Sequence, residues 1–270
     1  MNKLPLLEVC VDSLESAREA VRGGADRLEL CANLIIGGTT PSPYCIREAA
    51  KLGVPVNVLI RPRFGDFLFT QEEKQEQLES IAQLAALGAS GAVVGALTAD
   101  GALDTAFLSE CREAAKGLHL TLHRAFDVCR DAQEALEQAT QMGFDTILTS
   151  GQRAAAMEGA ALLAELVEKA DGRIAIMPGS GVNAGYLPGL IQSVGAQAYH
   201  LSAKKTVDSA MAFRREGVPM GLPMMSEFAL YRTDEEQVRR ARMAADAALD
   251  SCAAMWRGCE RIMKKKGVRV

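Results

Sequence analysis

The chain has 270 residues, of which 49% are apolar and 24% are charged, and its formal net charge is −4. This length and composition are typical of a folded protein with a sizeable core, and residues 1–270 are expected to form a single domain. A mildly acidic chain has no general attraction for nucleic acid, and no apolar stretch in the sequence is long enough to span a membrane.

Short segments with strand character alternate along the chain with segments whose apolar residues have helical spacing. The predicted strands cover residues 6–11, 27–32, 55–60, 92–97, 118–122, 146–149, 174–177 and 198–201. Their mean separation of about 27 residues is that of a β-α unit. A glycine stands before every strand except the first, where a helix needs a residue with positive φ in order to end. These glycines are Gly24, Gly53, Gly88, Gly117, Gly143, Gly172 and Gly195.

Capping-box spacing predicts the start of three helices, with the pairs Asp12 and Glu15, Thr70 and Glu73, and Thr233 and Glu236. Residues 204–232, after the eighth strand, are rich in Met, Pro and Gly and are predicted to form an elaborated loop. A long C-terminal helix is expected from about residue 234 to residue 263.

Strict alternation of strand and helix predicts parallel strands with right-handed crossovers, and eight such units close most naturally into a TIM (β/α)8 barrel. A doubly wound open sheet is the alternative. It lacks support because no GxGxxG motif follows the first strand.

The location of the protein is expected to be cytoplasmic, because Pro5 and Glu8 interrupt any apolar run at the N-terminus that could serve as a signal peptide. The seven cysteines contain no CxxC pair. In a cytoplasmic chain they should be reduced, and they are then either core residues or functional thiols.

Polar side chains occupy the strand positions that should face the inside of the barrel. Helices cover the outside, so the apolar positions of each strand face outward and the alternate positions face inward. The inward set is Glu8, Cys10, Asp12, Arg27, Glu29, Cys31, Asn57, Arg61, Thr121 and His123. Buried charges are costly unless they are paired, so the carboxylates and arginines of this set must pair. They form either an ionic network that only stabilises the barrel or a functional site at the C-terminal ends of the strands.

The loops at the same end of the barrel allow an enzymatic interpretation. Arginine side chains and the backbone N–H groups of the Gly179–Gly181 turn are groups that bind a carboxylate or a phosphate. The candidate residues for binding a small anion are Arg27, Arg61, Arg63, Arg124, Ser150, Gly179, Ser180, Gly181 and His200. The candidate general acids and bases are Glu8, Glu29, His123 and Asp127.

Seven blocks of sequence make the chain resemble the CutC family, barrel proteins associated with copper homeostasis. They are LEVCVDS (7–13), GGADRLELCA (23–32), GGTTPS (37–42), IRPRFGDF (60–67), HRAFD (123–127), ILTSG (147–151) and IMPGSGV (176–182). The chain departs from the family at Phe64 and Ser180, where the family tends to have glycine. The resemblance implies a cytoplasmic barrel, often a homodimer, that binds Cu(I), and the cysteines linked to copper in the family match Cys10 and Cys31.

The chemistry of Cu(I) is compatible with this expectation. The ion is soft and accepts two thiolates, and Cys10 and Cys31 have the same inward parity on neighbouring strands. Nearby arginines would favour the thiolate forms, and adjacent carboxylates would oppose them. The alternative is that both cysteines are small core residues. Met220, Met224 and Met225 are further soft donors in the loop after the last strand.

A third interpretation is a scaffold protein that uses the long last helix for dimerisation. It predicts that changes at the mouth of the barrel have no effect on function.

Overall fold

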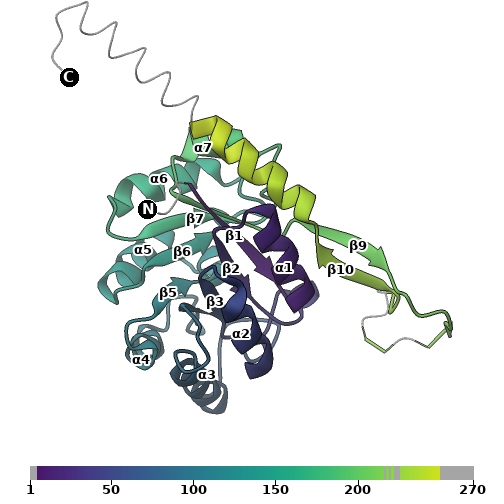
Figure 1. The fold of residues 1–270 in the computed structure, drawn as a ribbon. Coiled ribbons are helices and arrows are strands. Elements are labelled where there is room, and N and C mark those ends of the chain that lie inside the picture. The colour runs from purple at the N-terminus through teal and green to yellow at the C-terminus, as the bar shows by residue number, and fades with distance from the viewer. Residues whose placement is uncertain (1–4, 216, 219, 222–225, 250–270) are drawn as a thin grey trace, which may run out of the picture.

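Eight parallel strands form the centre of the molecule. The computed structural model describes residues 5–215, 217–218, 220–221 and 226–249. The strands are hydrogen-bonded in the order β7-β6-β5-β4-β3-β2-β1-β8, and β7 also contacts β8, so that the sheet is a nearly closed barrel (Figure 1). This arrangement confirms the predicted TIM barrel and excludes the open sheet. The strands are β1 Leu6–Val11, β2 Arg27–Leu30, β3 Val56–Leu59, β4 Gly91–Val94, β5 His119–Leu122, β6 Thr146–Thr149, β7 Ala175–Pro178 and β8 Ala198–Leu201.

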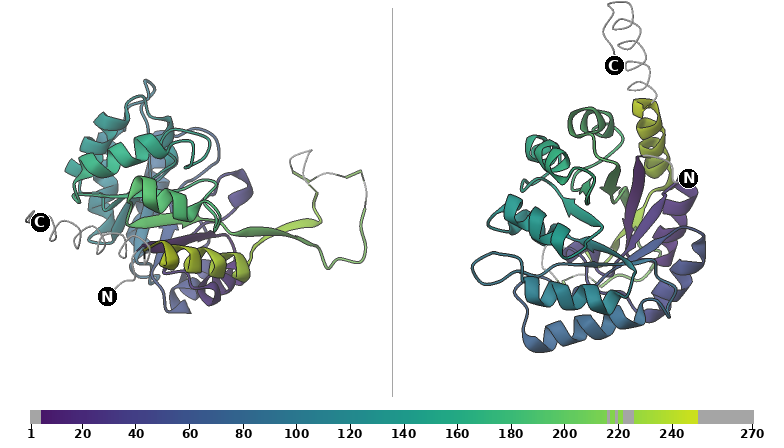
Figure 2. Two further views of the ribbon diagram at one scale, coloured as in Figure 1. Left: turned by 90° about the horizontal axis from the view of Figure 1, so that it is seen from above. Right: turned by 90° about the vertical axis from the view of Figure 1, so that its left-hand side faces the viewer.

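Helices follow the strands and surround the barrel (Figure 2). All seven glycines that were expected to end helices have positive φ, as the prediction requires. Gly24, for example, caps the first helix at φ 97°, and its N–H group bonds to the carbonyl groups of the last turn. The helices are α1 Leu14–Gly23, α2 Pro43–Ala49, α3 Gln71–Gln83, α4 Thr105–Ala115, α5 Ala132–Gln141, α6 Ala160–Ala170 and α7 Leu187–Val194, with short 3-10 helices η1 Leu34–Ile36, η2 Ala50–Leu52 and η3 Arg124–Val128.

Two of the three predicted helix caps are wrong by one residue. The cap of α1 is Ser13, not Asp12, and the last helix is capped by Asp234, not Thr233. The capping box at Thr70 has both of its hydrogen bonds. At each of the two shifted starts, two neighbouring residues are both capable of capping, so spacing alone did not select the right one.

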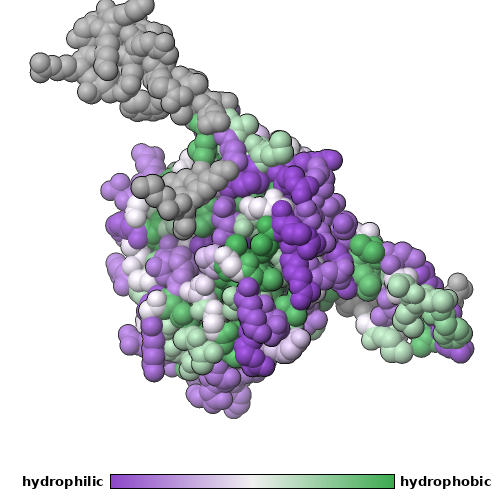
Figure 3. Space-filling model, in the orientation of Figure 1, coloured by the Kyte–Doolittle hydropathy of each residue, from purple (hydrophilic) through white to green (hydrophobic). Residues whose placement is uncertain are grey.

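The segment after β8 forms an antiparallel arm, where the sequence predicted an elaborated loop. Strand β9 (Lys204–Asp208) pairs with β10 (Ala229–Thr233), and the pair projects away from the barrel (Figures 1 and 2). Apolar side chains are exposed on this arm (Figure 3): Met211, Phe213, Val218 and Met220. Met224 and Met225 lie outside the described residues.

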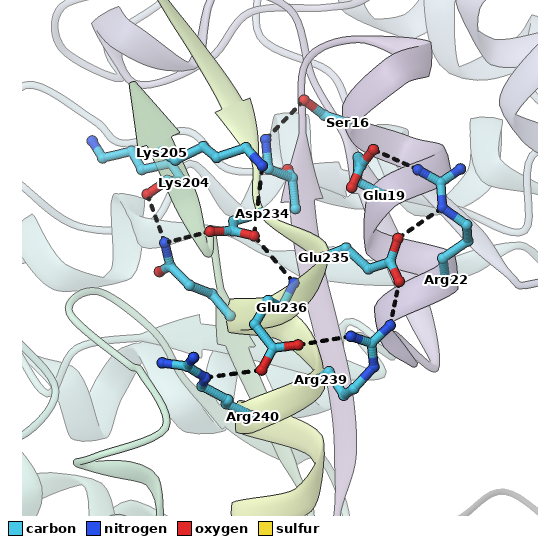
Figure 4. Close-up of polar contacts among 12 residues, drawn as sticks. Ser16, Glu19, Arg22, Lys204, Lys205, Asp234, Glu235, Glu236, Arg239 and Arg240 are labelled. Carbon is cyan, nitrogen blue, oxygen red and sulfur yellow. Dashed lines mark hydrogen bonds and ion pairs between the residues drawn. The ribbon is translucent and has the colours of Figure 1, made fainter. Parts of the chain in front are cut away.

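A helix over residues 235–249 follows the arm and lies beside α1, and its predicted continuation to residue 263 lies outside the described residues. Figure 4 shows the contacts that hold it there. Arg22 of α1 donates to Glu235 at 2.8 Å, and the N–H group of Thr233 donates to Ser16 Oγ at 3.1 Å. Arg242 pairs with Asp26 at 2.7 Å next to the start of β2. These contacts fix the base of the arm against the barrel.

The strands have the predicted inward and outward faces. Outward residues such as Val9 and Leu28 belong to the large core between the strands and the helices. Cys31, Leu59 and Val93 form a separate small cluster inside the barrel. The positions that alternate with the outward core therefore line the lumen, as the sequence predicted.

Candidate functional site

Glu8 is the centre of a buried ionic network in the lumen. Strand register places it beside Arg27 on β2 and beside His200 on β8. Its carboxylate accepts hydrogen bonds from Arg27 Nε at 2.5 Å and from His200 Nδ1 at 2.8 Å. Burial alone would raise the pKa of Glu8, but Arg27 and His200 outweigh burial and lower this pKa to about 2. Glu8 is therefore a carboxylate at neutral pH and fixes the orientation of the imidazole ring.

The second nitrogen of His200 faces two further site residues. His200 Nε2 lies 3.7 Å from Glu29 Oε2, and one ligand atom each of Cys10, Glu29 and His200 lies within 4.8 Å of the others. Burial lowers the pKa of His200, but contacts with Cys10, Glu8 and Glu29 outweigh it and raise this pKa well above its usual value. Burial also raises the pKa of Glu29. The three residues together offer one sulfur, one nitrogen and one oxygen ligand, all buried.

Cys31 lies beside this group without being part of it. Its thiol is 3.6 Å from Glu29 Oε2, and it is not a member of the group whose ligand atoms lie within 4.8 Å of one another. Burial, followed by the charges of Glu29 and Cys10, raises the pKa of the Cys31 thiol well above its usual value. Burial and the neighbouring acidic groups therefore both act against the thiolate form of Cys31, a balance that the sequence left open.

A cavity of about 150 Å³ opens at the mouth of the barrel, above the network. Cys10, Glu29, Cys31 and His200 line one side of it. Residues from the loops after β3 and β5 line the other side: Arg61, Phe67, His123 and Arg124. One cavity therefore brings together site residues that were predicted on β1, β2 and β8 and site residues that were predicted on β3 and β5.

His123 is a buried, neutral histidine at this cavity. Its Nδ1 accepts a hydrogen bond from the N–H group of Ala125, so the ring proton is on Nε2. Burial and the nearby charge of Arg61 lower the pKa of His123 to about 3. Its ring packs against Phe67 with the centroids 4.9 Å apart. Gly95 makes room for this ring, because a Cβ at that position would lie 2.4 Å from it.

Asp127, a predicted acid-base candidate, organises the loop after β6. Its carboxylate accepts hydrogen bonds from Thr149 Oγ1 at 2.5 Å, from the N–H group of Ser150 at 2.9 Å and from the N–H group of Gln152 at 3.2 Å. It also pairs with Arg124 at 2.7 Å, and Arg124 in turn donates to Ser150 Oγ. The N–H groups of Ser150 and Gln152 at the end of β6 are thus occupied by a carboxylate of the same chain.

Removing this carboxylate should destabilise the protein. We expect Asp127→Ala to lower the free energy of unfolding by about 2 kcal/mol, because buried donors of Thr149 and Ser150 lose their acceptor. Urea denaturation measures the change, and Asp127→Asn, which keeps one acceptor oxygen, should lose less. A change below about 0.5 kcal/mol in Asp127→Ala would contradict the structural role assigned to this residue.

The rest of the predicted anion site is not assembled at the cavity. Arg63 pairs with Asp66 of its own loop at 2.9 Å and with Glu73 in the first turn of α3 at 2.6 Å. In the Gly179–Gly181 turn, Ser180 Oγ donates to the carbonyl group of Ala154. Arg63 and this turn do not line the cavity. That Arg63 and this turn bind an anion away from the cavity stays a prediction.

Two contributors to the site were missed in the sequence. Met177 on β7 accepts a hydrogen bond from Arg27 Nη2 at its sulfur, 3.4 Å away. Gly95 follows β4, and its lack of a side chain is what allows His123 to lie across the lumen. A glycine at the end of a buried strand was the available signal, because it often marks a close approach.

Known proteins resemble this chain over most of its length. The CutC family matches residues 5–205. A CutC family protein of Parabacteroides distasonis is 48% identical over 87% of this chain and 98% of its own length. A human protein named copper homeostasis protein cutC homolog is 44% identical over 87% of this chain and 86% of its own. 

Solved structures give the same result for the fold. A CutC protein of Streptococcus agalactiae superposes with a TM-score of 0.69 at 34% identity, over 72% of this chain and 97% of its own. A thiamine phosphate pyrophosphorylase of Pyrococcus furiosus, at 16% identity and a TM-score of 0.56, shares the fold only. Within the described part of the chain, no helix has the length and apolarity that crossing a membrane requires.

Proposed function

The chain belongs to the CutC family, and from this premise we propose that it serves copper homeostasis by binding Cu(I) in the barrel lumen through Cys10 and His200. The observation that carries the proposal is the proximity of the ligand atoms of Cys10, His200 and Glu29, all buried and within 4.8 Å of one another.

The donor set fits this ion. A thiolate and an imidazole are ligand types that copper accepts, whereas a carboxylate suits harder ions, so Cys10 and His200 are the expected ligands. Glu8 accepts a hydrogen bond from His200 Nδ1, so Nε2 is the nitrogen that would bind the metal once it loses its proton. Such a pairing of carboxylate and histidine orients ligands in metal sites. Cys10 also lines a second cavity of about 130 Å³ below the arm, which offers a route to the sulfur.

A pair of cysteine ligands is the alternative form of this proposal. The Cys31 thiol contacts Glu29 and has a raised pKa, so it would have to lose its proton and turn toward Cys10 to supply a second thiolate. Variants of the two cysteines separate the forms.

Titration of reduced protein with Cu(I), against a competing chelator, tests the site. We expect about one Cu(I) per chain, at least about 100-fold weaker affinity in Cys10→Ser and His200→Phe, and a smaller loss in Cys31→Ser. Cys111→Ser is the control, because Cys111 is buried in the outer core. Loss of binding in Cys31→Ser equal to that in Cys10→Ser would support the paired-cysteine form. Unchanged binding in Cys10→Ser would refute both.

The homodimer and the cytoplasmic location stay predictions. The exposed apolar side chains of the arm, such as Phe213 and Met220, support a contact with a second copy of the chain.

A further inference from the structure

Arg61 is a buried cation without a buried counterion. Three arginines are buried within the described residues, and two of them have a carboxylate partner: Arg27 pairs with Glu8 and Arg242 with Asp26. Arg61 is 7% exposed, and no carboxylate of the described residues lies within ion-pair distance of it. Isolated buried charges are costly, so a site that keeps one usually provides an anion for it.

The guanidinium group is held in place by neutral acceptors. Arg61 Nη1 donates to the carbonyl groups of Gly37 and Gly38 at 3.1 and 3.3 Å, and Nη2 donates to the carbonyl group of Gly65 at 2.7 Å. Its Cζ lies 4.8 Å from the centre of the Phe67 ring. These contacts fix the position of the cation and leave its charge uncompensated. Its Nε has no hydrogen-bond partner in the described structure.

A second unpaired donor lines the same cavity. His123 is 5% exposed, and its Nε2, which carries the ring proton, also lacks a partner among the residues described. Both residues line the cavity of about 150 Å³ at the barrel mouth. Buried donors are almost always paired, so two unpaired donors at one cavity indicate a ligand with an acceptor group.

The remainder of the cavity determines what that ligand is. Leu34, Leu59, Phe67 and Leu148 give it a largely apolar lining. A cavity of this volume holds a ligand of about six non-hydrogen atoms. An inorganic anion would leave the apolar side chains unused, whereas a short organic acid satisfies both the donors and the apolar surface.

We propose that the cavity binds a small organic acid, with its carboxylate held by Arg61 and His123 and its apolar part against Leu59, Phe67 and Leu148. The two donors come from the loops after β3 and β5, and the proposed copper ligands Cys10 and His200 line the other side of the same cavity. This site is distinct from the anion site that the sequence suggested at Arg63 and the Gly179–Gly181 turn, which do not line this cavity.

Calorimetric titration of chelator-treated, metal-free protein with acetate, butyrate and 3-methylbutanoate tests the proposal. We expect butyrate to bind with a Kd of about 1 mM or tighter and acetate to bind more weakly. Butyramide, which has the same shape without the charge, should bind at least about tenfold more weakly than butyrate. Because the protein is metal-free in this titration, butyrate binding does not depend on bound copper, and its success or failure is distinguishable from that of the Cu(I) titration.

Variants of Arg61 and His123 test whether these two side chains hold the carboxylate of the ligand. Arg61→Gln should weaken butyrate binding about tenfold or more. His123→Asn keeps an acceptor for the N–H group of Ala125 but removes the Nε2 donor, and it should weaken binding about fivefold. Arg63→Gln, which removes a neighbouring charge that already has carboxylate partners, is the matched control and should bind as the unchanged protein does.

The proposal fails if none of the three acids binds at about 10 mM, or if inorganic phosphate binds and butyrate does not. It also fails if Arg61→Gln binds butyrate as tightly as the unchanged protein. If Arg61→Gln does not fold, as judged by its circular dichroism, the His123→Asn result decides: unchanged affinity refutes the site and weakened affinity supports it.

Discussion

Glu8→Gln is expected to lower the free energy of unfolding by about 3–5 kcal/mol. The reason is the position of Glu8 between two cationic partners. Its carboxylate bonds to Arg27 at 2.5 Å and to His200 at 2.8 Å, and both side chains are about nine-tenths buried. Glutamine keeps the size of the side chain but removes the charge, so the buried guanidinium group of Arg27 loses its only carboxylate at bonding distance among the described residues.

Urea denaturation at neutral pH measures this change in the free energy of unfolding. Two further variants test whether the change comes from the loss of a buried charge pair. Glu15→Gln removes an exposed carboxylate that pairs with Arg232, and it should cost about 0.5 kcal/mol or less. The double variant Glu8→Leu with Arg27→Met leaves no unpaired guanidinium group and should be more stable than Glu8→Gln. A loss below about 1 kcal/mol in Glu8→Gln would show that the network is not a main source of stability.

Gly91→Ala is expected to destabilise the protein by about 3 kcal/mol. Gly91 begins β4 and faces the lumen between Asn57 on β3 and His119 on β5. A Cβ at this position would lie 2.4 Å from Asn57 Oδ1 and 2.6 Å from the carbonyl oxygen of His119. The second contact is with backbone of the neighbouring strand, which cannot move without disturbing the sheet.

Gly189→Ala is the matched control for this change. Gly189 lies in α7, and no atom lies within 4 Å of the position that its Cβ would occupy. Alanine there should leave stability unchanged or raise it by about 0.5 kcal/mol, because it reduces the entropy of the unfolded chain. Thermal unfolding of both variants provides the measurement. Equal unfolding temperatures of the two variants would mean that β4 can shift to accommodate the added Cβ at Gly91.

Much of the fold was predictable because the relevant signals are local. The positive φ of Gly24 and of the six equivalent glycines follows from the need to end a helix before each strand. The arm of β9 and β10 was not predictable from its Met-rich and Pro-rich sequence. Its strands pair with each other and, apart from the buried Thr233, present exposed or half-buried side chains, so they lack the alternation that marks a strand packed on a core.

The candidate site was predictable only as a set of inward positions. Parity along each strand placed Cys10 and Cys31 in the lumen, and it gave no reason to prefer either of them as the neighbour of His200. In the folded barrel His200 lies beside Cys10 and Glu29, and Cys31 is next to Glu29 instead. Arg61 was expected to pair with a carboxylate, and it binds carbonyl groups.

The sequence by itself determined the number of barrel strands, the glycines at which the chain turns from helix to strand and the face of each barrel strand that points inward, because each of these depends on residues close together in the chain. Only the tertiary structure decided which inward groups meet. Glu8 and His200 are 192 residues apart, and they touch because β1 pairs with β8 when the barrel closes. That closure, with the stagger of its strands, also left Arg61 without a carboxylate partner at the cavity.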